Sequence, residues 1–434
     1  MAYTGFVVEI TELKPIEKAD KIQVATVFNT DVVVGMDVQI GDVMIYFPSD
    51  GQLSEKYAEA NNLVRKKDAN GENIGGYLDP DRRNIKAIKL RGVRSDGILM
   101  PLSSLYPVVG EKYVSKHLAV GDTIDVVNGE LICQKYVPKT AKSQGTPRQS
   151  KGKSKKKEHR LFPRHFDTSQ LAYSLDQFKE GDEITMTLKM HGTSARIGYL
   201  PEEKTGFVNK LVSKFGLQPK TNWGVVSGSR RVVLDNFDGG FYGSNGFRKK
   251  YHELFDGKLR KGEVVYGEIV GYVDKEKTIM PTVQNKKLKD KAFLKKYGET
   301  TTFSYGCEPG ESDFYVYRMT MTNEDGDVVE YPTWLAQLRC EQMGVKHVPV
   351  IKNFKLTVDN PFLKNKQLLM TIADKFAEGT DPIGLTHIKE GIVYRIENRE
   401  KFTAFKHKSF EFKVLEGIIK EEALEPDMEE ADGE

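Results

Sequence analysis

Short runs of β-branched and aromatic residues, separated by turn residues, dominate the chain from position 1 to position 137. These apolar runs stand at residues 5–10, 23–27, 32–34, 43–47, 85–90 and 123–127. Gly-Asp or Asp-Gly steps mark several of the turns, and residues 54–81 look helical and then loop-like, as an insertion would. Short strands at this spacing predict a small OB-like β-barrel over residues 1–137.

The pattern from residue 161 onward mixes strands with amphipathic helices. Strands are predicted at residues 183–189, 223–226, 263–271, 313–319, 391–396 and 402–405. Helical patterns occur at residues 168–179, 290–296, 333–343 and 365–377. Because strands and helices do not alternate as in βαβ units, we expect an α+β domain with antiparallel sheets over residues 161–417.

Two further segments differ from these domains in their charge composition. The chain of 434 residues has 65 basic and 62 acidic residues, so its net charge of +3 says little about partners. Residues 138–160 hold nine Lys or Arg and one acid, and predict a basic flexible linker that would attract a polyanion or simply act as a solvated tether. Residues 418–434 predict an acidic tail.

Several classes of protein are disfavoured by what the chain lacks. No apolar run is long enough to cross a bilayer, and the N-terminus has no signal-peptide pattern, so we expect no membrane span and no secretion. Cys133, Cys307 and Cys340 lie far apart, which disfavours a disulfide framework or a structural zinc site. A reducing, cytoplasmic setting is therefore expected.

Residues 187–194, Thr-Leu-Lys-Met-His-Gly-Thr-Ser, place a lysine at the end of a predicted strand, immediately before a turn. Alone this is a weak signal, because most such lysines only aid solubility. Four other pieces follow in order: Ser229-Arg230, Val265-Tyr266-Gly267-Glu268, Glu390-Gly391-Ile392-Val393 and Phe405-Lys406-His407-Lys408.

In this order the pieces resemble the covalent nucleotidyltransferase superfamily of ATP-dependent ligases and mRNA capping enzymes. Lys189 to Gly192 is similar to the Lys-x-(Asp/Asn/His)-Gly signature, and His191 resembles the RNA-ligase branch. Residues 314–317 are similar to the aromatic strand of phage nick-sealing RNA ligases. The resemblance implies a DNA-ligase-type, ATP-grasp-like nucleotidyltransferase domain.

The first half of the chain narrows the resemblance to RNA ligases of the Deinococcus and Naegleria type. Residues 15–22, 40–43 and 89–97 resemble those enzymes, which place an OB domain before the catalytic domain. DNA ligases and capping enzymes have it afterwards, and the short stretch that follows Lys408 here leaves too little room for another barrel. The basic linker and the acidic tail are not covered by the resemblance.

The resemblance implies a role for each site residue, which elementary chemistry supports. Lys189 is the nucleophile that attacks the α-phosphorus of ATP, and it must lose a proton to do so. Lys406 and Lys408 neutralise the α-phosphate from alternate positions on one strand face. Glu390 is expected to hold Mg²⁺ or Mn²⁺, and Glu268 to bind the ATP ribose and, as a second role, to share the metal.

Three other side chains complete the expected site. Tyr317 offers a π face to adenine, and His191 orients a metal-bound water or a phosphate. Arg230 contacts the ribose or the 5′-phosphate, with Arg231 as the alternative. Departures from the related patterns stand at Leu188, Ser194 and Arg318, where related RNA ligases carry glutamate, asparagine and aspartate.

These features predict an ATP-dependent RNA ligase that joins 3′-OH and 5′-phosphate RNA ends, with a nicked duplex as its substrate, and that acts as a monomer. A ligase for nicked DNA or for DNA/RNA hybrids is the nearest alternative. A capping enzyme is disfavoured by the position of the barrel. A nucleic-acid-binding relative without catalytic activity is disfavoured by the intact motifs.

Overall fold

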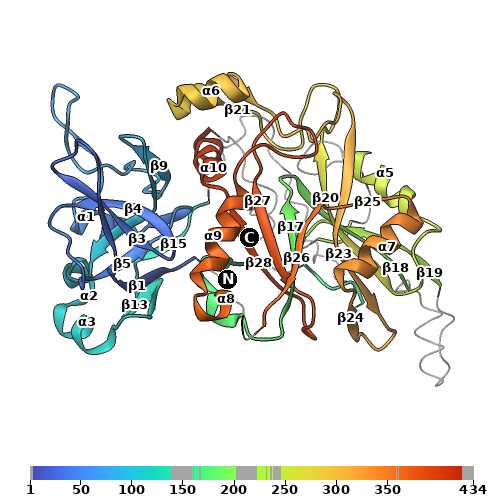
Figure 1. The fold of residues 1–434 in the computed structure, drawn as a ribbon. Helices are drawn as coiled ribbons and strands as arrows, with labels where there is room; N and C mark the ends of the chain where they lie inside the picture. The colour runs from blue at the N-terminus through green and yellow to red at the C-terminus, as the bar shows by residue number, and fades with distance from the viewer. Residues whose placement is uncertain are drawn as a thin grey trace, which may run out of the picture. The chain divides into compact units, whose positions relative to one another are not determined.

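The computed structural model divides the chain into two compact units, each described here by itself (Figure 1). It describes residues 3–137, 159, 161–165, 168–201, 222–230, 232–234, 237, 246–357, 359 and 361–422. The predicted basic linker at 138–160, except for His159, and residues 423–434 of the predicted acidic tail lie outside these residues. No helix among them is long and apolar enough to cross a membrane.

Unit 1 contains the described residues of Met1–Ala141, Gln367–Asp374 and Lys408–Pro426. Its four-stranded sheet has the order β11-β5-β1-β12, formed by Ile98–Pro101, Val43–Phe47, Gly5–Glu9 and Thr123–Ile124. A second sheet, β2-β3-β4, is formed by Leu13–Pro15, Ile22–Val27 and Thr30–Gly35. The smaller pairs are β9 and β10 (Ala87–Leu90, Val93–Asp96), β6 and β15 (Gly51–Leu53, Cys133–Lys135), β13 and β14 (Val126–Val127, Glu130–Leu131), and β7 and β8 (Lys66–Lys67, Asn73–Gly75).

The turns and the alternating apolar residues of this unit are those that the predicted β-barrel requires. The hairpin from β3 to β4 turns on Phe28 and Asn29, which both have positive φ, 49° and 59°. Such a tight turn suits the twist of antiparallel strands. Alternate residues such as Val7, Ile45 and Phe47 then form a core closed by α1 (Glu55–Ala60), α2 (Tyr106–Val109) and α3 (Glu111–His117).

The last described helix, α10 (Phe410–Glu422), also belongs to unit 1. Glu411 accepts a hydrogen bond from Arg94 at 2.8 Å, and Lys413 pairs with Asp96 at 2.5 Å. The sequence alone assigned residues 410–417 to the catalytic domain and residues 418–422 to the tail, whereas both stretches form this one helix. The ion pairs with β10 explain why the helix groups with the barrel.

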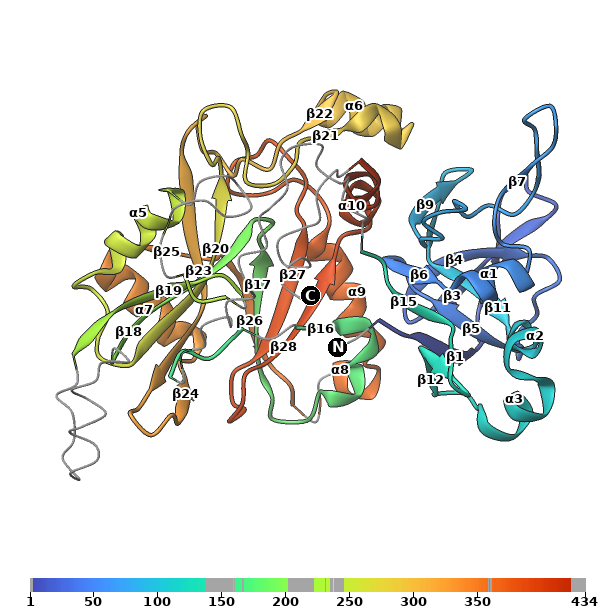
Figure 2. The ribbon, with the colours of Figure 1, turned by 180° about the vertical axis from the view of Figure 1, so that it is seen from behind.

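Unit 2 is built on two mainly antiparallel sheets (Figure 2). The first has the order β16-β28-β27-β17-β26, formed by Ser169–Gln170, Thr403–Lys408, Gly391–Ile396, Glu183–Lys189 and Val350–Lys355. The second has the order β19-β18-β20-β23-β24, formed by Trp223–Gly228, Thr193–Pro201, Glu263–Gly271, Ser312–Thr322 and Val328–Glu330. Among the described strands, only β16 with β28, and β25 (Lys346–His347) with β23, pair in parallel. Two short pairing strands, β21 and β22, lie at Val283–Gln284 and Thr300–Thr301.

Helices of unit 2 connect and cover these strands. They include α5 (Gly246–Phe255), α6 (Lys291–Tyr297), α7 (Thr333–Met343) and α8 (Pro361–Lys364). Most of α9 (Gln367–Ala377) groups with unit 1, and its last residues group with unit 2. Arg339 on α7 donates two hydrogen bonds of 2.8 Å to buried Glu263 on β20. This pair joins α7 to the central strand of the second sheet.

The helix predicted at residues 168–179 is wrong. The segment contains β16 and two 3₁₀ turns, Leu171–Tyr173 and Leu175–Gln177. Its buried apolar residues have spacings that a helix and successive 3₁₀ turns share. The Ser174 hydroxyl donates to the Gln170 carbonyl at 2.9 Å, a local bond that competes with continued helix.

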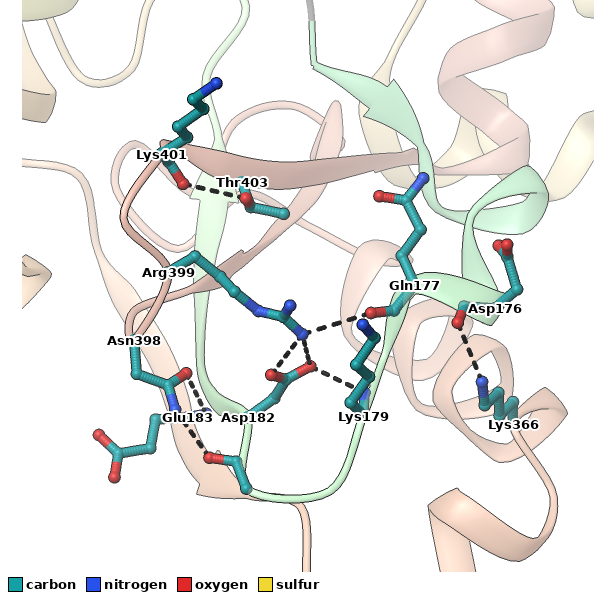
Figure 3. Close-up of polar contacts among 11 residues, drawn as sticks. Asp176, Gln177, Lys179, Asp182, Glu183, Lys366, Asn398, Arg399, Lys401 and Thr403 are labelled. Carbon is teal, nitrogen blue, oxygen red and sulfur yellow. Dashed lines mark hydrogen bonds and ion pairs between the residues drawn. The ribbon is translucent and has the colours of Figure 1, made fainter.

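A polar clamp holds β17 in register with β27 at the end of the sheet away from Lys189 (Figure 3). Arg399, after β27, donates to both carboxylate oxygens of Asp182 at 2.6 and 2.8 Å. Asn398 accepts from the Glu183 backbone at 3.1 Å and donates to the Gly181 carbonyl at 2.9 Å. Since β17 and β27 are antiparallel, a fixed register here also fixes which residues face each other at the opposite end.

Candidate active site

The site begins where the chain passes from the first sheet of unit 2 to the second. Lys189 is the last residue of β17, and the turn at 190–192 leads directly into β18. Lys189 lies opposite Gly391, the first residue of β27. The Lys189 Nζ is 2.8 Å from a carboxylate oxygen of Glu390, whose side chain is 4% exposed. Two predicted site residues that lie far apart in the sequence therefore meet directly.

The turn at residues 190–192 is packed tightly onto the second sheet. A Cβ on Gly192 would lie 2.3 Å from the Ile269 carbonyl oxygen, so only glycine allows this approach. His191 is buried, and its ring contacts Phe303 edge-on at 4.6 Å. The motif in the sequence includes both residues, and the close approach to Ile269 is the physical reason for the glycine.

Glu268 lies on β20 directly opposite Ser194 of β18. The Ser194 hydroxyl donates to Glu268 at 3.3 Å, and Glu268 is 9% exposed. A Cβ on the preceding Gly267 would lie 2.8 Å from the Tyr315 carbonyl oxygen, which accounts for the glycine before Glu268. The departure at Ser194 therefore replaces an amide with a hydroxyl that holds this carboxylate.

Tyr317 owes its position to a β-bulge in β23. Tyr266 of β20 pairs with Arg318 and Gly267 pairs with Val316, which leaves Tyr317 as the extra residue. A bulge of this kind turns a side chain out of the regular alternation. Tyr317 is half-buried and its ring lies 5.1 Å from that of His165.

His165 is a neighbour of the predicted site that sequence reasoning missed. Burial, and then the positive charges of Arg318, Arg230, Arg196 and Lys189, hold the pKa of the His165 imidazole well below its usual range. The neutral ring accepts a hydrogen bond from Arg318 at 3.4 Å. The His165 ring also lies close to the rings of Tyr266 and Phe402. Its signal in the sequence was only a histidine among aromatic residues after the linker.

Arg230 follows β19 in a short turn. The Ser229 carbonyl accepts from buried Arg196 at 2.9 Å, and the Ser229 backbone N–H donates to the Val232 carbonyl at 2.9 Å. This bonding fixes the backbone that carries Arg230. The alternative, Arg231, lies outside the described residues.

The departure at Arg318 has a structural explanation. Arg318 is 2% exposed, forms an ion pair with Glu330 of β24, and lies over the rings of Tyr266 at 4.5 Å and Phe402 at 4.6 Å. A buried arginine with a carboxylate partner and two aromatic faces is well satisfied. It therefore links β24 to the rings of Tyr266 and Phe402.

Leu188, another departure, faces away from Lys189. It is 2% exposed, and its backbone N–H donates to the Pro349 carbonyl at 2.9 Å. Thr187 shares the strand face of Lys189, because side chains alternate along a strand. The apolar Leu188 side chain therefore has no polar group to offer a base.

Lys406 and Lys408 occupy alternate positions of β28, with buried His407 between them. Both lysine side chains therefore lie on one face of the strand, as the Lys-x-Lys spacing predicts. The Lys408 amine binds both carboxylate oxygens of Glu416 on α10 at 2.7 Å. That carboxylate is a partner which the sequence did not indicate.

Glu390 and Glu268 could hold a divalent cation if phosphate oxygens and waters supply the remaining ligands. Within the described ranges, no three His, Cys, Asp or Glu side chains gather as a metal site. Burial, and then the charges of Glu390 and Glu268 among others, raise the pKa of the Tyr305 hydroxyl well above its usual range. Two carboxylates completed by phosphate oxygens and waters suit Mg²⁺ or Mn²⁺.

A buried arginine on α5, which the sequence did not suggest, holds the start of β18 in place. Arg248 donates to the Ser194 carbonyl at 3.0 Å and to the Thr193 hydroxyl at 2.7 Å. These bonds anchor the first residues of β18 immediately after the turn. No periodic pattern links residue 248 to residue 193, so only the folded chain reveals the contact.

Comparisons with known proteins bear on the family and the fold of the chain. A family model described as RNA ligase matches residues 182–415, more than half of the chain, and an OB-fold domain model matches residues 5–102. No curated protein matches the chain.

Solved structures of the RNA ligase from Naegleria gruberi share the fold. The one with PPi is 15% identical, with a TM-score of 0.57, and the match covers 96% of this chain and 98% of that one. A mutant with ATP and Mn is 16% identical, with a TM-score of 0.56 and coverage of 94% and 98%. A mutant with AMP and Mn is 16% identical, with a TM-score of 0.57 and coverage of 94% and 97%.

The predicted fold class, an α+β chain with an OB domain before a ligase-type domain, is confirmed by these matches. The predicted family is confirmed by the extent of the family match, which includes Lys189, Glu268, Tyr317, Glu390, Lys406 and Lys408. The chain belongs to the RNA ligase family.

Proposed function

We propose that this protein is an ATP-dependent RNA ligase that seals 3′-OH and 5′-phosphate ends through a lysyl-AMP intermediate. One observation carries the proposal: the Lys189 amine lies 2.8 Å from Glu390 at the junction of two sheets. Family membership and the likeness to ligases with ATP or AMP and Mn support it.

In the first step the Lys189 amine, after losing a proton, attacks the α-phosphorus of ATP. The Nζ–P bond forms as the bond from Pα to the oxygen of pyrophosphate breaks. Lys406 and Lys408 are proposed to neutralise the charge that builds on the α-phosphate oxygens. A divalent cation bound at Glu390 and Glu268 would add positive charge against the triphosphate.

The two later steps move AMP and then release it. An oxygen of the RNA 5′-phosphate attacks the AMP phosphorus, and the Nζ–P bond breaks to return Lys189. The RNA 3′-OH then attacks the activated 5′-phosphorus, loses its proton and expels AMP. Tyr317 is proposed to stack on adenine, His191 to orient a phosphate or metal-bound water, and Arg230 to contact the ribose or the 5′-phosphate.

The substrate and setting belong to the same proposal. A nicked RNA duplex is the expected substrate, gripped by the OB domain, and the chain is expected to act as a monomer. The cysteines at 133, 307 and 340 are all unpaired thiols, which supports a reducing, cytoplasmic setting.

Incubation with α-labelled ATP and Mg²⁺ or Mn²⁺ tests the central step. The protein should acquire acid-labile label on Lys189, located by peptide mass spectrometry. Lys189→Ala should abolish labelling, because it removes the nucleophilic amine beside Glu390. Lys352→Ala, an exposed lysine on neighbouring β26, is the matched control and should label normally. Equal labelling of the Lys189 variant contradicts the proposal.

A further inference from the structure

Tyr305 lies under the turn that follows Lys189, although the two residues are remote in sequence. Its hydroxyl oxygen accepts a hydrogen bond from the His191 backbone N–H at 2.7 Å. The tyrosine is 2% exposed, and His191 is 9% exposed, so the bond is made in a buried environment. Without this acceptor, a buried N–H would lose its partner, which is costly.

The environment keeps the Tyr305 hydroxyl neutral. Burial, followed by the charges of Glu390, Asp381 and Glu268, holds the pKa of the Tyr305 hydroxyl well above its usual range. A buried tyrosine hydroxyl with a raised pKa stays protonated near neutral pH. It therefore serves as a stable hydrogen-bonding group and not as a base.

The backbone of Tyr305 is held in an uncommon conformation. Its φ is 51°, which is rare for a bulky residue and persists only when the surroundings enforce it. The next residue, Gly306, approaches Gly384 so closely that a Cβ on Gly384 would lie 2.5 Å from the Gly306 nitrogen. The Tyr305 ring also contacts the buried His387 ring at 4.5 Å, nearly perpendicular.

The loop contacted by Tyr305 leads directly to Glu390. Asp381 accepts from the backbone N–H groups of Ile383 at 2.9 Å and Gly384 at 3.0 Å, and its own N–H donates to the His387 carbonyl at 2.8 Å. This bonding makes the loop at residues 381–388 a compact support. Tyr305 consequently touches both segments whose side chains, Lys189 and Glu390, form the ion pair.

We propose that Tyr305 is a positioning residue for lysine adenylylation, whose hydroxyl fixes the turn after Lys189 relative to the segment that carries Glu390. The inference rests on the proposed function, because it assigns Tyr305 to the step in which Lys189 is the nucleophile. Small displacements of a nucleophile reduce rates strongly, since in-line attack requires close alignment.

Tyr305→Phe tests this role, since it removes one oxygen and keeps the ring. The rate constant of lysine adenylylation at saturating ATP should fall about tenfold, the equivalent of one lost buried hydrogen bond. The dissociation constant for ATP should change by less than about threefold, since the hydroxyl bonds the turn and not the nucleotide. Sealing of a pre-adenylylated nicked RNA, where Lys189 is no longer the nucleophile, should stay within about twofold.

Tyr251→Phe is the matched control, because it also removes a buried hydroxyl from the same unit. That hydroxyl bonds the Ser312 side chain at 3.0 Å, away from the turn. The control should adenylylate at the wild-type rate even if both variants lower the melting temperature equally. A purely structural role for Tyr305 predicts equal rates in the two variants and would overturn the inference.

Amide hydrogen exchange of the unmodified protein gives a second test, independent of whether any variant folds. The His191 amide should exchange as slowly as amides inside β17, although it lies in a turn. Fast exchange at His191 would also overturn the inference. Absence of label on the wild-type protein would instead refute the proposed function itself, so the two failures are distinguishable.

Discussion

At the scale of residues, the predicted site contains charged side chains that lie far apart in the sequence and form ion pairs in the folded chain. Lys189 and Glu390 meet at 2.8 Å, whereas Lys408 is bound by both oxygens of Glu416. The second pair means that Lys408 must share or leave Glu416 when it contacts a phosphate. Lys406, two positions earlier on the same strand face, can be tested separately.

Lys406→Ala or Lys408→Ala should slow lysine adenylylation by roughly 10²–10³-fold, the effect of losing one preorganised electrostatic stabiliser. ATP affinity should change much less, because the charge they neutralise develops during the reaction. Single-turnover labelling with ATP measures both quantities. Lys401→Ala, which removes an exposed lysine from the same hairpin, should change the rate by less than about twofold. A double variant at 406 and 408 that labels at the normal rate would leave these lysines with RNA binding alone.

At the scale of elements, strand register places Lys189 opposite Gly391. The register is held at the other end of β17 by Arg399 and Asp182 (Figure 3). Asp182 is 5% exposed in this pair and Arg399 is 30% exposed. A slip by a single position would turn Lys189 to the opposite face of the sheet, so this distant pair matters for the site.

Arg399→Ala should lower the free energy of unfolding by about 1–3 kcal/mol, because it leaves a largely buried carboxylate short of a partner. Urea denaturation measures this change. Lys355→Ala removes a lysine that pairs with Glu183 at the same strand end, where the two side chains are 56% and 53% exposed. That control should cost no more than about 1 kcal/mol. Equal destabilisation by the two substitutions would argue against a special role for the Arg399 clamp.

At the scale of the whole molecule, catalysis and nucleic-acid binding are assigned to different parts of the chain. The OB-fold model matches residues 5–102, and the RNA ligase model matches residues 182–415. Helix α10 follows the Lys-x-Lys strand and forms ion pairs both with β10, through Glu411 and Lys413, and with Lys408 of β28, through Glu416. The two functions are therefore separable in sequence except at this helix.

Deletion of residues 1–137 should retain part of the self-adenylylation and lose most of the nick sealing. The residues assigned to the first step all follow residue 137, whereas phosphate contacts by the barrel are expected to provide much of the RNA affinity. Labelling, sealing and circular dichroism are measured together, because α10 loses Arg94 and Asp96 as partners. If the truncated chain is folded and seals nicks as well as the full chain, the barrel has another purpose.

The sequence by itself determined the order of the site motifs and the two kinds of fold. The local sequence was sufficient to place β17, β20, β27 and α7. The strand β20 is a continuous run of buried residues, and α7 buries residues that lie mostly three or four positions apart. Alternation along a strand was also enough to place Lys406 and Lys408 on one face. The helix predicted from residue spacing at 168–179 does not form. A hydrogen bond from the Ser174 hydroxyl and 3₁₀ turns take its place.

Only the tertiary structure decided which distant side chains support the predicted site. Tyr305, His165 and Arg248 lie in loops or on a helix with no motif of their own. Tyr305 bonds the turn after Lys189, Arg248 bonds the start of β18, and the ring of His165 lies beside that of Tyr317. The bulge at Tyr317 likewise follows from the pairing of β23 with β20. The physical reason is that periodicity reports contacts between near neighbours, whereas these contacts are created when the register of separate strands brings remote loops together.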